Sequence, residues 1–229
     1  MNDIEKAISA SAACGIVVDY VVGQIEKKEY NVGDRLPPER DLAIQLDVGR
    51  TTVREAIKVL NYLGFVESIQ GSGNYISNTY DKTTANIMRV MFRRDEVDFH
   101  DFTMFRRMLE LQAFDLALEH ATIDQKKEMK QIVELMDTET DGERIFALDF
   151  RFHTLLAEAS KSKLIVINFL ALSSVIMDYM HNTYHDTVSR RTGGYERLQE
   201  YHHIIINALI HKDREAGRQA IVNHFSWLY

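Results

Sequence analysis

The stretch Leu36–Ser77 reads LPPERDLAIQLDVGRTTVREAIKVLNYLGFVESIQGSGNYIS and decides how the N-terminal part of this chain folds. Both prolines of the chain, Pro37 and Pro38, stand at its front, where a fixed φ suits the first turn of a helix. We expect that helix to run from about Pro38 to Leu46. Asp47-Val48-Gly49 is then predicted to form a tight turn, because glycine accepts backbone angles that other residues avoid.

A second helix is expected from about Arg50 to Leu63, and its two faces differ. Apolar residues recur on it at three- and four-residue spacing, the pattern of a buried stripe: Val53, Ala56, Ile57, Leu60 and Leu63. Thr51, Arg54 and Lys58 fall on the opposite face, and Arg50 projects from the flank. Gly64 is predicted to end the helix as a left-handed cap.

Two short strands, 65–69 and 74–77, are expected to follow around the turn Gln70-Gly71-Ser72-Gly73. A basic helix face is by itself usually no more than solvated surface. Here it belongs to the second helix of a helix-turn-helix, and a glycine-tipped hairpin follows directly. This order is that of a winged helix-turn-helix, which presents its second helix to the major groove of DNA. The sequence therefore predicts binding to double-stranded DNA.

The two motifs of this stretch resemble the GntR family of bacterial transcription regulators. They are Leu36-Pro37-Pro38-Glu39-Arg40 and Arg50-Thr51-Thr52-Val53-Arg54. The chain departs from the family's pattern at Pro38 and Gly49, where serine is common, and loss of a serine cap costs ~1 kcal/mol or less. The resemblance implies DNA contacts from Arg40, Arg50, Thr51, Thr52 and Arg54, and phosphate contacts from backbone amides around Gly71. Arginines read guanine edges or bind phosphates, and the sequence leaves their individual roles open.

Composition places the chain among intracellular globular proteins. Its 229 residues, 45 % of them hydrophobic, allow one large domain or two modest ones. No apolar run reaches the roughly 20 residues of a membrane span, and the N-terminal stretch lacks the pattern of a secretory signal. Cys14 is the only cysteine, so no internal disulfide forms, and a reducing cytoplasm is the expected location.

Net charge argues mildly against nucleic acid, because the whole chain carries −7. Residues 1–79 hold eight Lys and Arg against eleven Asp and Glu, a net charge of −3. The field at a recognition helix is set by charges within a Debye length of ~8–10 Å. Residues 50–63 hold three basic residues and one acidic residue. We therefore expect weak non-specific affinity and a two-fold homodimer that doubles the DNA contacts.

The rest of the chain is typical of a mainly α protein. An apolar-periodic helix is expected over 5–28, and from Tyr80 onward the chain has no proline and few glycines. We predict a winged helix-turn-helix domain over 1–79, a linker over 80–84 and an all-α antiparallel helical bundle over 85–229. Helices of the bundle are expected at about 83–93, 98–121, 123–138, 143–160, 164–187, 195–211 and 213–228. Thr122 and Gln125 fit a capping box, and Asp213 fits an N-cap.

Four polar residues of the bundle occupy positions that should face its core: Asp149, His153, His202 and His224. Asp149 and His153 are four residues apart on one helix, and each of the other two histidines lies along an apolar stripe. One carboxylate and three imidazoles suit Zn²⁺, Ni²⁺ or Mn²⁺. Any one of these histidines alone would be read as an ordinary buried histidine.

The four residues together resemble the FCD ligand-binding domain of the fatty-acid-regulator-like branch of the GntR family. That domain opens with Asp-x-x-Phe-His, and Asp149-Phe150-Arg151-Phe152-His153 has this pattern. His202, Ile205, Ala208, Asp213 and His224 follow at matching intervals. The resemblance covers roughly residues 85–228 and implies that the four residues bind a metal. His203 should be solvated, although an error of one residue in the helical register would exchange it with His202.

Arg106 and Glu110 lie in a segment that resembles the family's Arg-x-x-Leu-Glu helix. There the arginine implies an anchor for the carboxylate of an effector. A surface Arg–Glu pair at i, i+4 is the alternative. His181 and His185 are also four apart, but their polar neighbours favour solvent exposure.

Three functions are compatible with these observations. The first is a transcription regulator, by family tendency a repressor, controlled by a small organic acid at the metal site. The second is a metal-free regulator that binds a larger acyl-type ligand. The third is a metal-dependent helical-bundle enzyme, which is disfavoured because a di-metal bundle needs two Glu-x-x-His pairs and the region near the site offers one, Glu200 to His203. No catalytic residues are predicted.

Overall fold

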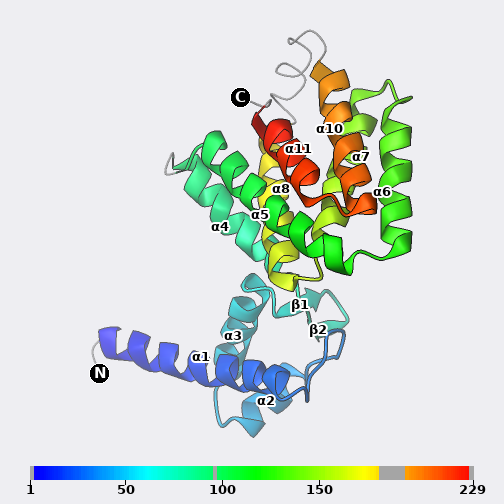
Figure 1. Cartoon of the computed structure of the whole chain (residues 1–229). Helices are drawn as coiled ribbons and strands as arrows, with labels where there is room; N and C mark the ends of the chain where they lie inside the picture. The colour runs from blue at the N-terminus through cyan, green and yellow to red at the C-terminus, as the bar shows by residue number, and fades with distance from the viewer. Residues whose placement is uncertain (1–2, 95–96, 181–193, 227–229) are drawn as a thin grey trace. The chain divides into compact units, whose positions relative to one another are not determined.

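The computed structural model describes residues 3–94, 97–180 and 194–226 (Figure 1). By its internal contacts the chain divides into two compact units, Met1–Thr83 and Thr84–Tyr229. Among the helices of the described residues, none has both the length and the apolar character that crossing a membrane would require.

The first unit contains the predicted helix-turn-helix and wing. Its elements are α1 (Asp3–Glu26), α2 (Glu39–Gln45), α3 (Arg50–Tyr62), β1 (Val66–Ile69) and β2 (Gly73–Ile76). The two strands pair antiparallel, with Val66 opposite Ile76. One core joins these elements and includes Val17 and Val21 of α1, Leu42 of α2, Val53 and Leu60 of α3, and both residues of that strand pair.

The turn between α2 and α3 differs from the expectation in one detail. The left-handed residue is Asp47, with φ of 52°, whereas Gly49 is extended at φ −69° and ψ 145°. Asp47 directly follows the end of α2, and the Val48 N–H then bonds to the Ala43 carbonyl at 3.0 Å. Aspartate tolerates this conformation better than most residues. Gly49 instead serves as the N-cap of α3 and offers no side-chain hydrogen bond.

The end of α3 confirms one expectation and corrects another. Gly64 has a φ of 79°, and a Cβ there would lie 2.8 Å from the Thr79 carbonyl oxygen, so glycine is required. Leu63 was expected to complete the buried stripe but is 38 % exposed. The reason is that α3 ends at Tyr62, and Leu63 is already its C-cap residue.

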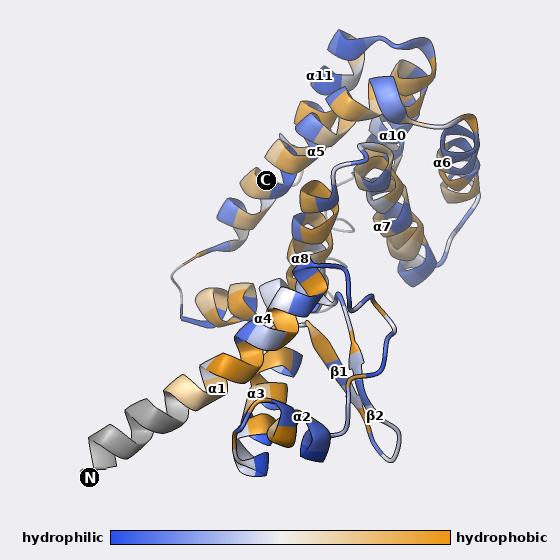
Figure 2. Ribbon diagram, turned by 90° about the horizontal axis from the view of Figure 1, so that it is seen from below, coloured by the Kyte–Doolittle hydropathy of each residue, from blue (hydrophilic) through white to orange (hydrophobic). Residues whose placement is uncertain are grey.

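The helices of the second unit form around two apolar clusters. They are α4 (Tyr80–Arg93), α5 (Phe99–His120), α6 (Ile123–Met136), α7 (Gly142–Ala159), α8 (Lys163–Met180), α10 (Gly194–His211) and α11 (Arg214–Ser226). The larger cluster joins α5, α6, α7, α10 and α11 and contains Phe114, Phe152, Ile205 and Ile221. The smaller one joins α4, α5 and α8. Figure 2 shows hydrophobic and hydrophilic residues alternating along these helices, as amphipathic packing requires.

Helix starts in this unit follow local capping rules. The Thr122 hydroxyl accepts from the Gln125 N–H at 3.1 Å, and the Gln125 side chain accepts from the Thr122 N–H at 3.0 Å, which confirms the predicted capping box. The Asp213 carboxylate accepts from the Ala216 N–H at 3.1 Å and so caps α11 as expected. A second capping box, between Asp98 and Asp101, starts α5.

The segment 80–84, expected to be a linker, is instead the first turn of α4. The Thr79 carbonyl accepts from the Thr83 N–H, and the Tyr80 ring packs edge-to-face on Phe65 with centroids 5.3 Å apart. A helical turn of polar residues has the composition of a linker, which explains the difference. The helix expected over 164–187 is described as α8 up to Met180; residues 181–187, with His181 and His185, lie outside the described residues.

Candidate metal centre and nucleic-acid interface

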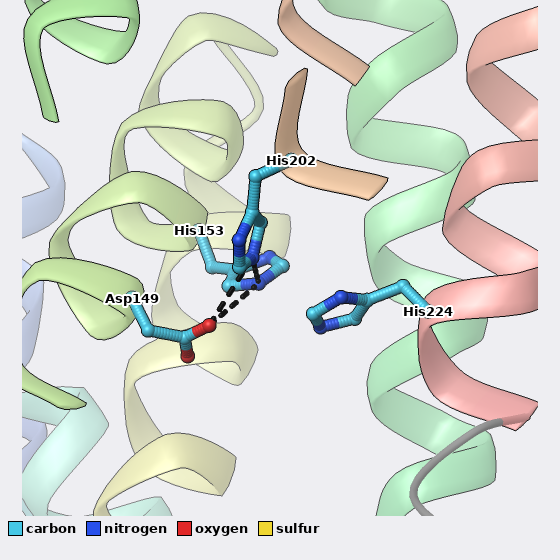
Figure 3. A group of neighbouring side chains, drawn as sticks. All are labelled: Asp149, His153, His202 and His224. Atoms are coloured by element: carbon cyan, nitrogen blue, oxygen red, sulfur yellow. Dashed lines mark hydrogen bonds and ion pairs between the residues drawn. The ribbon is translucent and has the colours of Figure 1, made fainter. Parts of the chain in front are cut away.

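The four residues selected from the sequence lie together inside the second unit (Figure 3). Asp149 and His153 project from α7, His202 from α10 and His224 from α11. One nitrogen or oxygen atom from each lies within 4.8 Å of the others. Asp149 Oδ1 is 3.1 Å from His202 Nε2 and 3.6 Å from His153 Nε2. Three helices therefore direct a carboxylate and three imidazoles toward one point.

Apolar packing brings the histidines inward. His202 precedes Ile205, Ile206 and Leu209, all of which are buried in the main core. His224 adjoins Phe225 and lies three residues after Ile221, also in that core. The three histidines are at most 3 % exposed. The Asp149 side chain is 16 % exposed and is the most accessible of the four.

A buried carboxylate supports the cluster from behind. Glu110 of α5 is fully buried; its Oε2 lies 2.5 Å from His153 Nδ1, and its Oε1 accepts from Arg106 Nε at 2.8 Å. Carboxylates in this position fix the ring orientation of metal-binding histidines. The Arg106 side chain is only 11 % exposed, so the alternative of a surface pair is wrong.

The role of Glu110 was missed in the sequence analysis. A signal was present: Glu110 lies three and four residues before Ala113 and Phe114, on the buried face of α5. What the sequence does not show is the partner, because His153 is 43 positions away.

Charges within the cluster determine its protonation. Burial alone would raise the pKa of Glu110 and of Asp149, but the positive charge of His153 outweighs it and lowers both. Burial alone would lower the pKa of His153, yet the two carboxylates raise it to about 9. Burial lowers the pKa of His202 and, further, that of His224. One imidazole is therefore protonated at neutral pH and two are neutral, so a cation competes with a single proton.

The donor set fits a divalent cation. Nδ1 of His202 and Nδ1 of His224 are buried and have no hydrogen-bond partner in the part of the chain that the structure describes. Imidazole nitrogens with one carboxylate oxygen are ligands of borderline softness, which zinc, nickel and manganese accept. His203 lies apart from the cluster, since its Nε2 is 2.9 Å from Asp137 Oδ2 and its side chain is 42 % exposed. The exchange of register between the two histidines is therefore not observed.

The residues considered for DNA contact lie in the first unit. Val53, Ala56, Ile57 and Leu60 bury one face of α3. Arg50, Thr51 and Arg54 are exposed, and Thr52 is half-buried. Arg40 is exposed on α2, and Gly71, at φ 75°, is exposed at the wing turn.

The sequence analysis did not foresee that Arg54 has a partner. Its Nη2 lies 3.2 Å from Glu39 Oε2, and both side chains are accessible to solvent, at 58 % and 26 %. An exposed pair of this kind contributes about 0–1 kcal/mol. Arg54 is thus lightly held and free to change partners.

Comparisons with known proteins agree with both units. The family model "Bacterial regulatory proteins, gntR family" matches residues 16–76, and the FCD domain model matches residues 101–226. The regulator LutR of Bacillus subtilis is 28% identical, with 88% of this chain and 93% of that protein covered. The Uxu operon transcriptional regulator of Escherichia coli is 30% identical, with coverage of 87% and 79%. The solved structure of a Streptococcus agalactiae GntR matches with a TM-score of 0.73 at 26% identity, covering 92% of this chain and 96% of that one.

A winged helix-turn-helix combined with a helical ligand-binding unit defines a DNA-binding transcription regulator that responds to a small molecule. The chain belongs to the GntR family and carries the FCD domain of its fatty-acid-regulator-like branch. The enzyme considered as an alternative is therefore excluded, because the matched families and relatives are transcription regulators.

Replacing Glu110 with alanine should lower the free energy of unfolding by about 3–5 kcal/mol, because two buried cationic groups lose their counter-charge. Urea denaturation of the full-length chain measures this. Asp137→Ala is the matched control, since it removes the carboxylate of an exposed His–Asp pair, and it should cost less than about 1 kcal/mol. Equal losses in the two variants would show that Glu110 does not have this role.

Proposed function

We propose that the protein is a repressor that binds operator DNA as a homodimer, and that a small carboxylate bound at a metal in the second unit controls its DNA affinity. Residues 1–79 would form the DNA-binding part and residues 85–229 the metal- and effector-binding part. A repressor of this kind acts on the chromosome, so we place it in the cytoplasm.

DNA recognition is assigned to the exposed face of α3 and to the wing. Arg50, Thr51, Thr52 and Arg54 would reach the major groove, Arg40 would support them from α2, and the amides around Gly71 would contact phosphate. The support is the opposite burial of the two faces of α3. Because the first unit is acidic overall, a two-fold homodimer supplies the second set of contacts that tight binding needs.

The single observation that carries the metal assignment is the convergence of Asp149, His153, His202 and His224 within 4.8 Å. These residues would hold Zn²⁺, Ni²⁺ or Mn²⁺. When bound, the metal would supply a Lewis acid for an oxygen of the effector. Glu110 keeps the His153 ring in place through its 2.5 Å contact with Nδ1.

Arg106 is assigned to the carboxylate of the effector. Its Nε is used by Glu110, whereas its Nη2 is buried and has no partner among the described residues. Its guanidinium lies over Phe169 and Phe225, with Cζ 5.5 and 5.4 Å from the ring centroids. A carboxylate is the natural ligand of such a donor, and charge-assisted pairing is strong away from water. Effector binding would then shift the dimer toward an arrangement of its two winged helices with a different operator affinity.

One observation favours the metal-free alternative. A cavity of about 760 Å³ lies along α5 and is lined by Met104, Phe105, Met108 and Leu109, with Arg107 and Arg218 at its border. An acyl chain with an anionic head group fits this chemistry. The metal content of the purified protein and its affinity for a medium-chain fatty acid separate the two functions.

Arg54→Ala should weaken operator binding by about tenfold or more, because a good arginine contact to a base contributes roughly 1–3 kcal/mol. The measurement is fluorescence anisotropy with duplexes selected from a random library by the full-length protein. Arg144→Ala, which removes an exposed arginine of α7, should bind as the wild type does. Unchanged affinity in Arg54→Ala would refute the assignment of α3.

His202→Ala should lose the divalent metal, because it removes one of the four converging ligands. Elemental analysis after loading with Zn²⁺, Ni²⁺ or Mn²⁺ and gel filtration gives the metal content of each variant. His203→Ala is the matched control, since it changes the adjacent histidine outside the cluster, and it should retain the metal. A wild-type protein that retains none of the three metals would contradict the assignment.

A thermal-shift screen with citrate, malate, succinate and lactate, with and without metal, tests the effector class. A ligand at about 100 times its Kd stabilises the protein by ~2.7 kcal/mol, so a binder is easily detected. Arg106→Ala should abolish the metal-dependent shift. Arg107→Ala, the neighbouring arginine on the other cavity, should preserve it. A shift that survives in Arg106→Ala would count against the carboxylate anchor.

A further inference from the structure

Ser173, within α8, has a buried hydroxyl for which the described residues provide no hydrogen-bond partner. The residue is 1 % exposed. Helical serine and threonine hydroxyls normally return to a carbonyl three or four residues earlier. Thr154 does so to Phe150 at 2.8 Å, and Ser226 to Val222 at 2.8 Å. Ser173 therefore departs from the behaviour of comparable residues in the same chain, and an unpaired buried hydroxyl is unfavourable.

The position of Ser173 along α8 places it level with Asp149. A short connection joins α7 to α8, so the two helices run antiparallel. Asp149 lies twelve residues before Lys161 in this connection, and Ser173 lies twelve after it. Phe150 and Phe169 stack across the pair with centroids 6.5 Å apart, which supports this alignment.

The face of α8 that carries Ser173 is the one directed at Arg106. Ser173 follows Phe169 by four residues, which places both on one face of the helix. The Phe169 ring lies 5.5 Å from Arg106 Cζ. Two buried polar groups without partners in the described chain, Arg106 Nη2 and the Ser173 hydroxyl, thus border the interior beside Asp149.

We propose that Ser173 contacts the effector and that its hydroxyl binds a hydroxyl group of the carboxylate held by Arg106. The inference rests on the proposed function and narrows the effector to a short hydroxycarboxylate. A guanidinium suits a carboxylate, whereas a serine hydroxyl both donates and accepts and so suits a neutral hydroxyl. A site built to bond a ligand hydroxyl rejects the analogue that lacks it, because its own polar group is then left unpaired.

Isothermal titration of the metal-supplemented, full-length protein with matched acids tests the proposal. The pairs are malate with succinate and lactate with propionate, which differ by one hydroxyl. The wild type should bind the hydroxy acid of a pair about tenfold or more tightly. Ser173→Ala should reduce this ratio to about twofold or less, keep its affinity for the deoxy acids and melt no lower than the wild type.

Ser174→Ala is the matched control. Ser174 is the next residue of α8, and its hydroxyl accepts a hydrogen bond from Arg89 Nη2 at 2.5 Å. This variant should keep the wild-type ratio.

Four results would overturn the inference. Discrimination that persists in Ser173→Ala, or a lower melting temperature of that variant, would give Ser173 no role in recognition or a structural one. Equal binding of both members of each pair by the wild type would refute the hydroxycarboxylate class and leave the proposed function in place. Absence of binding by all four acids would count against the proposed carboxylate effector and overturn this inference with it.

Discussion

The helical unit depends on one buried interaction, the simultaneous binding of Glu110 to Arg106 and His153. A carboxylate removed from water is unfavourable by several kcal/mol unless charged partners surround it, and here both of its oxygens have one. One partner is on the same helix and the other is on α7, so the contact fixes α5 against α7. The orientation of His153 and the direction in which Arg106 presents its free nitrogen both follow from it.

The sequence predicts most of the fold because the decisive features are local. Helical spacing reveals which side of α3 is buried, and it identifies Asp149, His153, His202 and His224 as polar residues along apolar stripes. Packing those stripes into one core is then enough to bring the four residues together. The two short capping motifs at Thr122 and Asp213 are equally local, which explains why they were recognised.

The differences arise where tertiary contacts decide. Segment 80–84 resembles a linker in composition but becomes helical where Tyr80 packs on Phe65. The left-handed position of the turn falls on Asp47 because α2 ends directly before it, not where the glycine stands. Glu110 and Ser173 have meaning only through groups on other helices, and no spacing rule in a single sequence connects them to those groups.

The seclusion of the four-residue cluster has a kinetic consequence. Its histidines are at most 3 % exposed, so an ion in the proposed site could enter or leave only when α7, α10 and α11 separate. Exchange would then be slow compared with effector binding. The metals available while the chain folds, rather than those present later, would decide which ion each molecule carries through its lifetime.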